Sequence, residues 1–145
     1  MNYKLLTEKG SETYALIFDP GDEVLDELES FASKKALSAG HFTAIGAFSR
    51  VKLGFFNFEK QDYEEILIDE QVEVLALTGD IALLDNSPKI HAHVVVGKRN
   101  GTAHGGHLLS ASVQPTLELI LEETPAHLIR RMDPSTGLPL VEIDD

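Results

Sequence analysis

Four of the six histidines in the chain lie within one short segment, HAHVVVGKRNGTAHGGH, which runs from His91 to His107. Neutral imidazole is the commonest protein ligand for metals such as zinc. The chain contains no cysteine, so thiolate metal sites, disulfides and thiolate nucleophiles are excluded. The segment therefore indicates a metal site built from nitrogen and oxygen ligands.

The segment is typical of a β-hairpin around Asn100-Gly101, and its register decides which histidines meet. His91 and His93 are two residues apart, so their side chains share one face of a strand. In a hairpin with a two-residue loop, His104 turns to that same face. It then stands about four positions along the strand from His93, more than about 10 Å away and too far to share an ion.

The alternative hairpin has a three-residue loop, Arg99-Asn100-Gly101, in which the glycine is left-handed and forms a bulge. His93 then lies directly opposite His107, with Cβ atoms about 5 Å apart, and His91 is a diagonal neighbour on the same face. His104 points away. This register predicts a metal site formed by His91, His93 and His107.

Three histidines with an open fourth position are typical of a catalytic zinc site. Zn²⁺, or another divalent metal, is therefore the expected cofactor, and Gly105-Gly106 would clear space beside the ligand. The competing interpretation is that the histidines are merely close in sequence. His41 and His127 are isolated and are expected to be surface residues.

Two further residues are candidates for catalysis. Glu118 interrupts the apolar stretch PTLELIL and could transfer protons beside a metal, and Arg130 could bind a carboxylate. Either side chain could equally face solvent. The chain has no G-x-S-x-G motif, phosphate-binding P-loop or G-x-G-x-x-G fingerprint.

The charge of the chain argues against nucleic acid as a partner. Twelve Lys and Arg face 24 Asp and Glu, which gives a formal net charge of −12. Binding to nucleic acid depends on basic groups that neutralise phosphates. The short basic stretches, residues 50–52, 98–99 and 130–131, are surrounded by acids.

The hydrophobic pattern predicts one helix and many strands. DEVLDELESFASKKAL has apolar residues at helical spacing, acids in its first turn and lysines in its last, which predicts a helix over about 22–38 that Gly40 ends. Glycines 46 and 54 are expected at bulges or tight bends of a curved sheet. Strands are expected over residues 13–19, 41–58, 63–69, 73–83, 89–97, 102–113 and 117–123, followed by a terminal hairpin around 134–137.

These elements predict an α+β fold with a largely antiparallel, curved sheet. No break in composition divides residues 1–145, so we expect a single domain. No apolar run is long enough to cross a membrane, and the first residues, MNYKLLTEKGSETYA, do not resemble a signal peptide. The expected location is cytoplasmic.

AIGAFSRVKLGFF, HAHVVVGKRNGTAHGGHLL, PTLELIL and RRMDPSTGL together resemble the plant and prokaryote conserved (PPC) domain, from about residue 14 to 142. The resemblance implies an α/β fold with an antiparallel sheet and assembly into homotrimers. Sheet surface left uncovered by a single helix agrees with such assembly. Prokaryotic members are often labelled DNA-binding, but this chain has no Arg-Gly-Arg-Pro hook.

The order H-x-H, turn, G-G-H is also similar to the metal hairpin of α-acetolactate decarboxylase, a more distant relative in which three histidines hold zinc. That likeness carries over to His91, His93 and His107. Two function classes therefore remain open. One is a zinc protein that acts on or senses a small oxygenated molecule, and the other is a non-catalytic DNA-binding or regulatory module.

Overall fold

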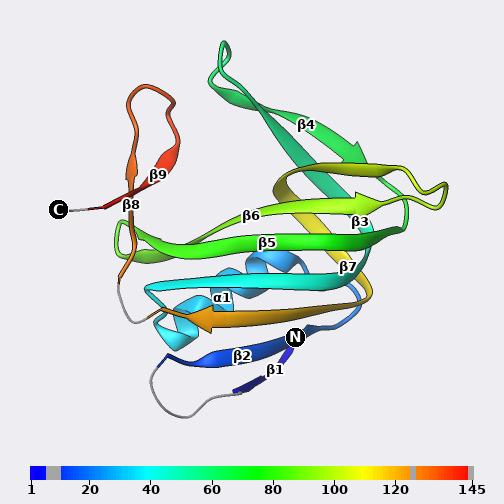
Figure 1. Ribbon diagram of the computed structural model, residues 1–145, viewed down its shortest axis with the longest axis horizontal. Helices are drawn as coiled ribbons and strands as arrows, with labels where there is room; N and C mark the ends of the chain where they lie inside the picture. Colours follow the sequence, from blue (N-terminus) through cyan, green and yellow to red (C-terminus); the bar gives the residue numbers. More distant parts are fainter. Residues whose placement is uncertain (6–10, 125–126, 144–145) are drawn as a thin grey trace.

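The computed structural model describes residues 1–5, 11–124 and 127–143. It contains one helix, α1, and nine strands within these residues (Figure 1). The elements are β1 (Asn2–Leu5), β2 (Thr13–Phe18), α1 (Val24–Lys35), β3 (Ala39–Asn57), β4 (Asp62–Ile68), β5 (Val72–Leu84), β6 (Ser87–Gly97), β7 (Ala103–Glu123), β8 (Ile129–Met132) and β9 (Pro139–Glu142).

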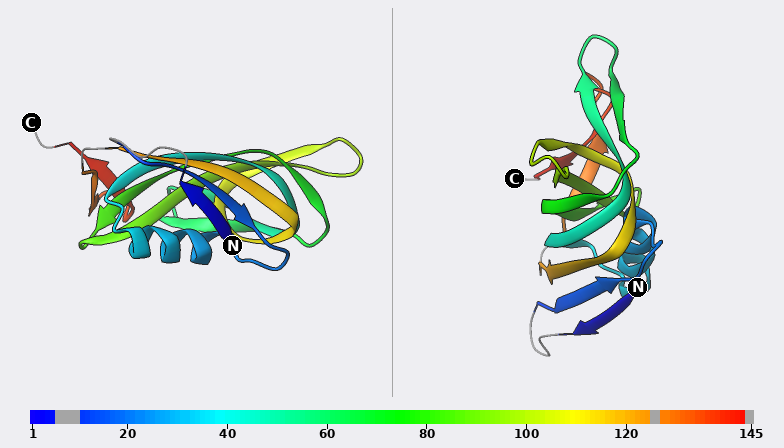
Figure 2. Two further views of the ribbon diagram at one scale, coloured as in Figure 1. Left: turned by 90° about the horizontal axis from the view of Figure 1, so that it is seen from below. Right: turned by 90° about the vertical axis from the view of Figure 1, so that its right-hand side faces the viewer.

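The strands form one curved sheet whose two longest members, β3 and β7, pair along most of their length. β5 pairs with β3, β6 pairs with β5, and the start of β7 pairs with β6, so these four strands close a circuit. The pairing is antiparallel except for one parallel contact between β5 and β8. Figure 2 shows the strong curvature that results. The expected antiparallel sheet with one helix is confirmed.

The core lies between the inner face of this sheet and α1, which covers one side of it (Figure 2). Leu28 and Phe31 of α1 are buried there, as helical spacing predicts. Leu117, Leu119 and Leu121 alternate inward on β7, while the residues between them face outward. The outer face of the sheet is therefore free to carry polar and functional groups.

The helix is shorter than the predicted range of about 22–38. It starts at Val24 and ends at Lys35, because Ala36 adopts a left-handed conformation (φ 55°) that closes the last turn. The prediction that Gly40 ends the helix was wrong, since Gly40 already belongs to β3.

Most predicted strands are confirmed, with two differences. β1 was not predicted, and residues 103–123 form one strand instead of two. Pro115 lies inside this strand where the pairing with β3 shifts register, so its missing N–H interrupts no ladder bond. The predicted bulge at Gly46 is confirmed, because the pairing of β3 shifts register on both sides of this residue. Gly46 has φ +153°, and a Cβ atom there would lie 2.8 Å from the Cα of Leu117. Gly54 instead makes room for the ring of Tyr63.

Among the described residues, no helix is long and apolar enough to span a membrane.

Candidate metal centre

The hairpin between β6 and β7 has the register with the three-residue loop. His93 pairs with His107, and Gly97 pairs with Ala103. The N–H of Lys98 donates to the carbonyl of Thr102 (2.9 Å), and Gly101 is left-handed with φ +82°. Of the two loops that Asn-Gly permits, the structure has the three-residue one, and this loop places His93 opposite His107.

His91, His93 and His107 form a compact cluster on the outer face of the sheet. The ring centroid of His91 lies 5.1 Å from each of the other two, and those two are 5.3 Å apart. One nitrogen from each ring can be chosen so that all three lie within 4.8 Å of one another. The Nε2 atoms of His91 and His93 are 3.2 Å apart. Two tetrahedral zinc–nitrogen bonds of 2.0–2.1 Å would place their nitrogens about 3.4 Å apart.

The cluster contains an orphaned nitrogen that a cation could satisfy. The Nδ1 atom of His107 is buried and has no hydrogen-bond partner among the described residues. An unpaired buried polar atom is costly, and a bound metal is one partner that removes the cost. The ring of His107 is held in place by Tyr63, which stacks on it with centroids 4.6 Å apart and planes inclined by 20°.

The surroundings favour the neutral form of two of these imidazoles, His93 and His107. Burial, and then the neighbouring His91 and His93, lower the pKa of His107 from 6.5 to about 4. Burial and then His91 lower the pKa of His93 as well. Because only a deprotonated imidazole binds a metal, these lowered pKa values keep His93 and His107 ready to bind one at neutral pH.

The other three histidines lie outside this cluster. His104 is exposed, faces away from His107, and has its Nε2 atom 3.5 Å from the Thr102 hydroxyl. His127 is exposed. His41 is also exposed, and its Nε2 atom lies 3.6 Å from a carboxylate oxygen of Glu122.

Arg130, a predicted catalytic candidate, is joined to the cluster through Asp80. Its side chain is only 5% exposed, and its guanidinium binds the Asp80 carboxylate and the carbonyl of Pro139. The other oxygen of Asp80 lies 3.7 Å from Nδ1 of His91. Burial alone would raise the pKa of Asp80, but His91 and Arg130 outweigh it, and the net pKa is lowered. A carboxylate behind the distal nitrogen of a histidine is the usual support for a metal ligand.

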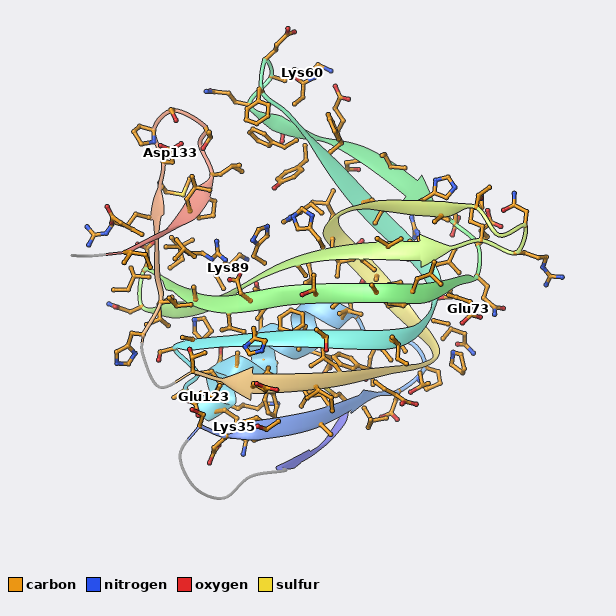
Figure 3. All side chains as sticks on the ribbon, viewed as in Figure 1. Lys35, Lys60, Glu73, Lys89, Glu123 and Asp133 are labelled. Atoms are coloured by element: carbon orange, nitrogen blue, oxygen red, sulfur yellow. The ribbon has the colours of Figure 1, made fainter. Side chains whose placement is uncertain are left out.

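A cavity of about 230 Å³ adjoins the cluster. His91 and His107 line it, together with Lys89, Arg130 and Tyr63. Two hairpins flank it, one made by β3 and β4 and one by β8 and β9. Figure 3 labels Lys60 and Asp133 near their tips, and Lys89 on β6 below them. The tips are joined because the side-chain amide of Gln61 donates to the carbonyl of Ser135 (2.7 Å).

Two other expectations have different outcomes. Glu118 is exposed on the outer face of β7 and does not line the cavity beside the histidines, so the structure does not bring it to them. Gly105-Gly106 does not clear space for a ligand. A Cβ atom at Gly106 would instead lie 2.9 Å from the carbonyl oxygen of Gly54, so this glycine allows β3 to approach closely.

Sequence reasoning missed Asp80, Lys89 and Tyr63. A signal for Asp80 exists in the dipeptide Asp85-Asn86, which forms the two-residue turn between β5 and β6 with φ of 50° and 62°. Such a turn predicts pairing of Leu84 with Ser87 and therefore of Asp80 with His91, as observed.

Comparison with known proteins agrees with this architecture. The Plants and Prokaryotes Conserved (PCC) domain matches residues 6–125. The chain belongs to this family. A plant- and prokaryote-conserved (PPC) protein from Pyrococcus horikoshii is 29% identical, with a TM-score of 0.86 and coverage of 99% of this chain and 96% of that one. A metal-containing protein from Archaeoglobus fulgidus is 30% identical, with a TM-score of 0.84 and 99% coverage of both chains.

Further relatives of this PCC-domain chain differ in length and in degree of similarity. The chain is 32% identical over 127 residues to the bifunctional protein GlmU of Synechococcus sp. (strain JA-3-3Ab). The matched region makes up 86% of this chain but only 19% of that much longer protein. A Staphylococcus aureus protein similar to α-acetolactate decarboxylase is 12% identical, with a TM-score of 0.57 and coverage of 77% of this chain and 52% of that one. That likeness shows a shared fold alone.

Proposed function

We propose that this PCC-domain protein binds one divalent metal ion, zinc, through His91, His93 and His107, and that a small oxygenated molecule binds beside it. The observation that carries the proposal is the cluster itself, in which each of the three histidines offers one nitrogen and these nitrogens all lie within 4.8 Å of one another. The similar protein from Archaeoglobus fulgidus is described as metal-containing, which supports the proposal. Zinc is preferred because imidazoles suit it and no thiolate is present.

With three protein ligands, a bound zinc ion would supply a Lewis acid or an activated water at the mouth of the cavity. The residues of the chain would do the remaining work. Tyr63 fixes the ring of His107, and Asp80 orients His91. Equilibrium dialysis against zinc tests the proposal, and we expect one zinc ion per chain. A chain that retains no zinc above a chelator-treated blank would contradict it.

We propose that Asp80 is a positioning residue for the ligand His91. Replacing Asp80 by asparagine should lower zinc affinity about tenfold, the lower end of the range for such supporting groups. Competition with a chromophoric chelator measures the affinity. The matched control is Asp69→Asn, because Asp69 also faces an arginine, Arg50, at 3.7 Å but lies away from the cluster. Equal zinc affinity of the two variants would show that Asp80 does not support the site.

We also propose that the protein forms a homotrimer through the outer face of its sheet. Ile45, Leu75 and Ile120 are large apolar residues that are exposed there and line one hollow, and the first two also line an adjoining one. Contiguous apolar surface of this kind marks protein interfaces. The face is distinct from the helix-covered core.

Replacing Ile45 by arginine should convert the trimer to a monomer, because a charge would be desolvated in the interface. Light scattering measures the mass, and the single chain is 15.9 kDa. Ile143→Arg is the matched control, because Ile143 is also an exposed isoleucine but follows β9, away from the proposed interface. Its side chain is 73% exposed, against 61% for Ile45. A wild-type protein that is monomeric at micromolar concentration would overturn the proposal.

Binding to DNA is a second candidate function. It is favoured by the likeness to a protein from Bacteroides thetaiotaomicron that is provisionally described as DNA-binding. That protein is 27% identical, with a TM-score of 0.87 and coverage of 97% of this chain and 96% of that one. The charge opposes it. A net charge of −12 per chain gives −36 for a trimer (3 × −12), which repels phosphate. We expect no retardation of a random DNA duplex at physiological salt. Tight retardation that weakens as salt rises would reveal a basic surface and favour the DNA function.

A further inference from the structure

We infer that the cavity beside the three histidines takes a small aliphatic monocarboxylate. The inference rests on the proposed metal site and specifies its ligand. It follows from the charge, the apolar walls and the size of the cavity.

The charges that line the cavity are positive. Lys89 and Arg130 contribute to its surface and no Asp or Glu does, although acids outnumber bases 24 to 12 in the chain. Their partner carboxylates, Glu29 and Asp80, do not line the cavity. A divalent metal on three neutral imidazoles would add uncompensated positive charge. A ligand with one negative charge is therefore favoured over a neutral or cationic one.

Lys89 is the residue best placed to bind the anion. The Arg130 side chain is only 5% exposed and its two terminal nitrogens bind Asp80 and the carbonyl of Pro139, while its Nε atom is buried without a partner among the described residues, so it offers the ligand little accessible surface. Lys89 uses one contact, 2.8 Å from its Nζ to Glu29, and an ammonium group has three donors. Its side chain is about half exposed, and it lies on β6 two residues before His91, so the two side chains share one face of the strand. It can therefore bind a carboxylate without losing its present partner.

The remaining walls are apolar. Ile90, Leu138, Pro139 and Leu140 make up four of the nine lining residues. They suit a hydrocarbon chain and offer no donors to the additional oxygens of a phosphate. The volume of about 230 Å³ lies below the roughly 300–1,000 Å³ typical of drug-sized ligands. The joined tips of the two flanking hairpins, Gln61 to Ser135, limit expansion. A short aliphatic acid fits these conditions.

Cobalt(II)-loaded protein tests the inference, because the visible absorption of Co²⁺ reports both metal binding and changes at its open position. Butyrate should change the spectrum saturably. Butyrate has two more methylenes than acetate and should bind about 15-fold more tightly, since each buried methylene is worth about 0.8 kcal/mol, or about fourfold. Butyramide, which has the same shape without the charge, should bind at least about tenfold more weakly than butyrate.

Lys89→Gln should weaken butyrate binding about tenfold, whereas Glu29→Gln, which removes only the outer partner, should not weaken it. The spectrum before addition of ligand shows whether each variant holds its metal. A Co²⁺ spectrum that butyrate leaves unchanged would overturn the inference and leave the metal site standing. Equal binding of butyramide, or tighter binding of inorganic phosphate, would also overturn it. Absence of any Co²⁺ band would overturn both proposals.

Discussion

Replacing His107 by alanine should lower the zinc affinity of the protein by more than about 100-fold. Loss of a group that only supports a ligand costs up to about that much, and loss of one of three ligands costs more. His107 faces His93 directly across the hairpin, so no other histidine can take its place. Zinc content after dialysis, together with chelator competition, measures the effect.

His104→Ala is the matched control, because it removes the same side chain three residues away. His104 is exposed and faces away from the cluster. Its removal should leave zinc affinity unchanged. If His104→Ala loses the metal while His107→Ala retains it, the third ligand has been assigned wrongly. If neither change matters, the histidines are close together without binding zinc.

The metal-free protein should lose stability as pH falls from about 6.5 to about 4. The pKa of His107 is lowered from 6.5 to about 4 in the folded protein, so between these values the unfolded chain binds a proton that the folded chain does not. The free energy of unfolding therefore falls as the pH falls, by at most about 3 kcal/mol from this one residue over the whole interval and by less after solvent screening of the half-buried ring. The lowered pKa of His93 acts in the same direction.

Urea unfolding at a series of pH values between 4 and 7 measures this dependence, and His107→Gln isolates the contribution of one histidine. The variant should have a flatter dependence than the wild type, whereas His104→Gln should follow the wild type. Other acid-sensitive groups, such as Asp80, act on all three proteins alike. Equal slopes in the wild type and His107→Gln would show that His107 titrates normally.

The part of the site that the sequence predicts is the part encoded locally. Asn100-Gly101 predicts the turn but permits two loops, and the three-residue loop was favoured because it brings His93 and His107 within reach of one ion, a pairing that the structure confirms. The alternation of His91 and His93 is equally local. The single helix was predicted for the same reason, although its end at Ala36 was not, because that residue adopts a left-handed conformation that its side chain does not favour.

The rest of the site depends on contacts between distant segments. Arg130 meets Asp80 only because β8 contacts β5, and no local pattern encodes that contact. Tyr63 reaches His107 because β4 and the start of β7 both pair with β3. The sequence marked Arg130 as a candidate without showing its partner. The cavity likewise exists only when the terminal hairpin lies beside the histidines.

X-ray absorption spectroscopy of the zinc-loaded wild-type protein tests the central claim most directly, because it counts the imidazoles on the metal. The proposal predicts one zinc ion per chain, with three imidazole nitrogens at about 2.0–2.1 Å and at least one oxygen from water or a bound anion. The same measurement on His107→Ala should find little bound zinc. A wild-type spectrum with fewer than three imidazoles, or one that is unchanged in His107→Ala, would contradict the assignment of His91, His93 and His107 as the ligands.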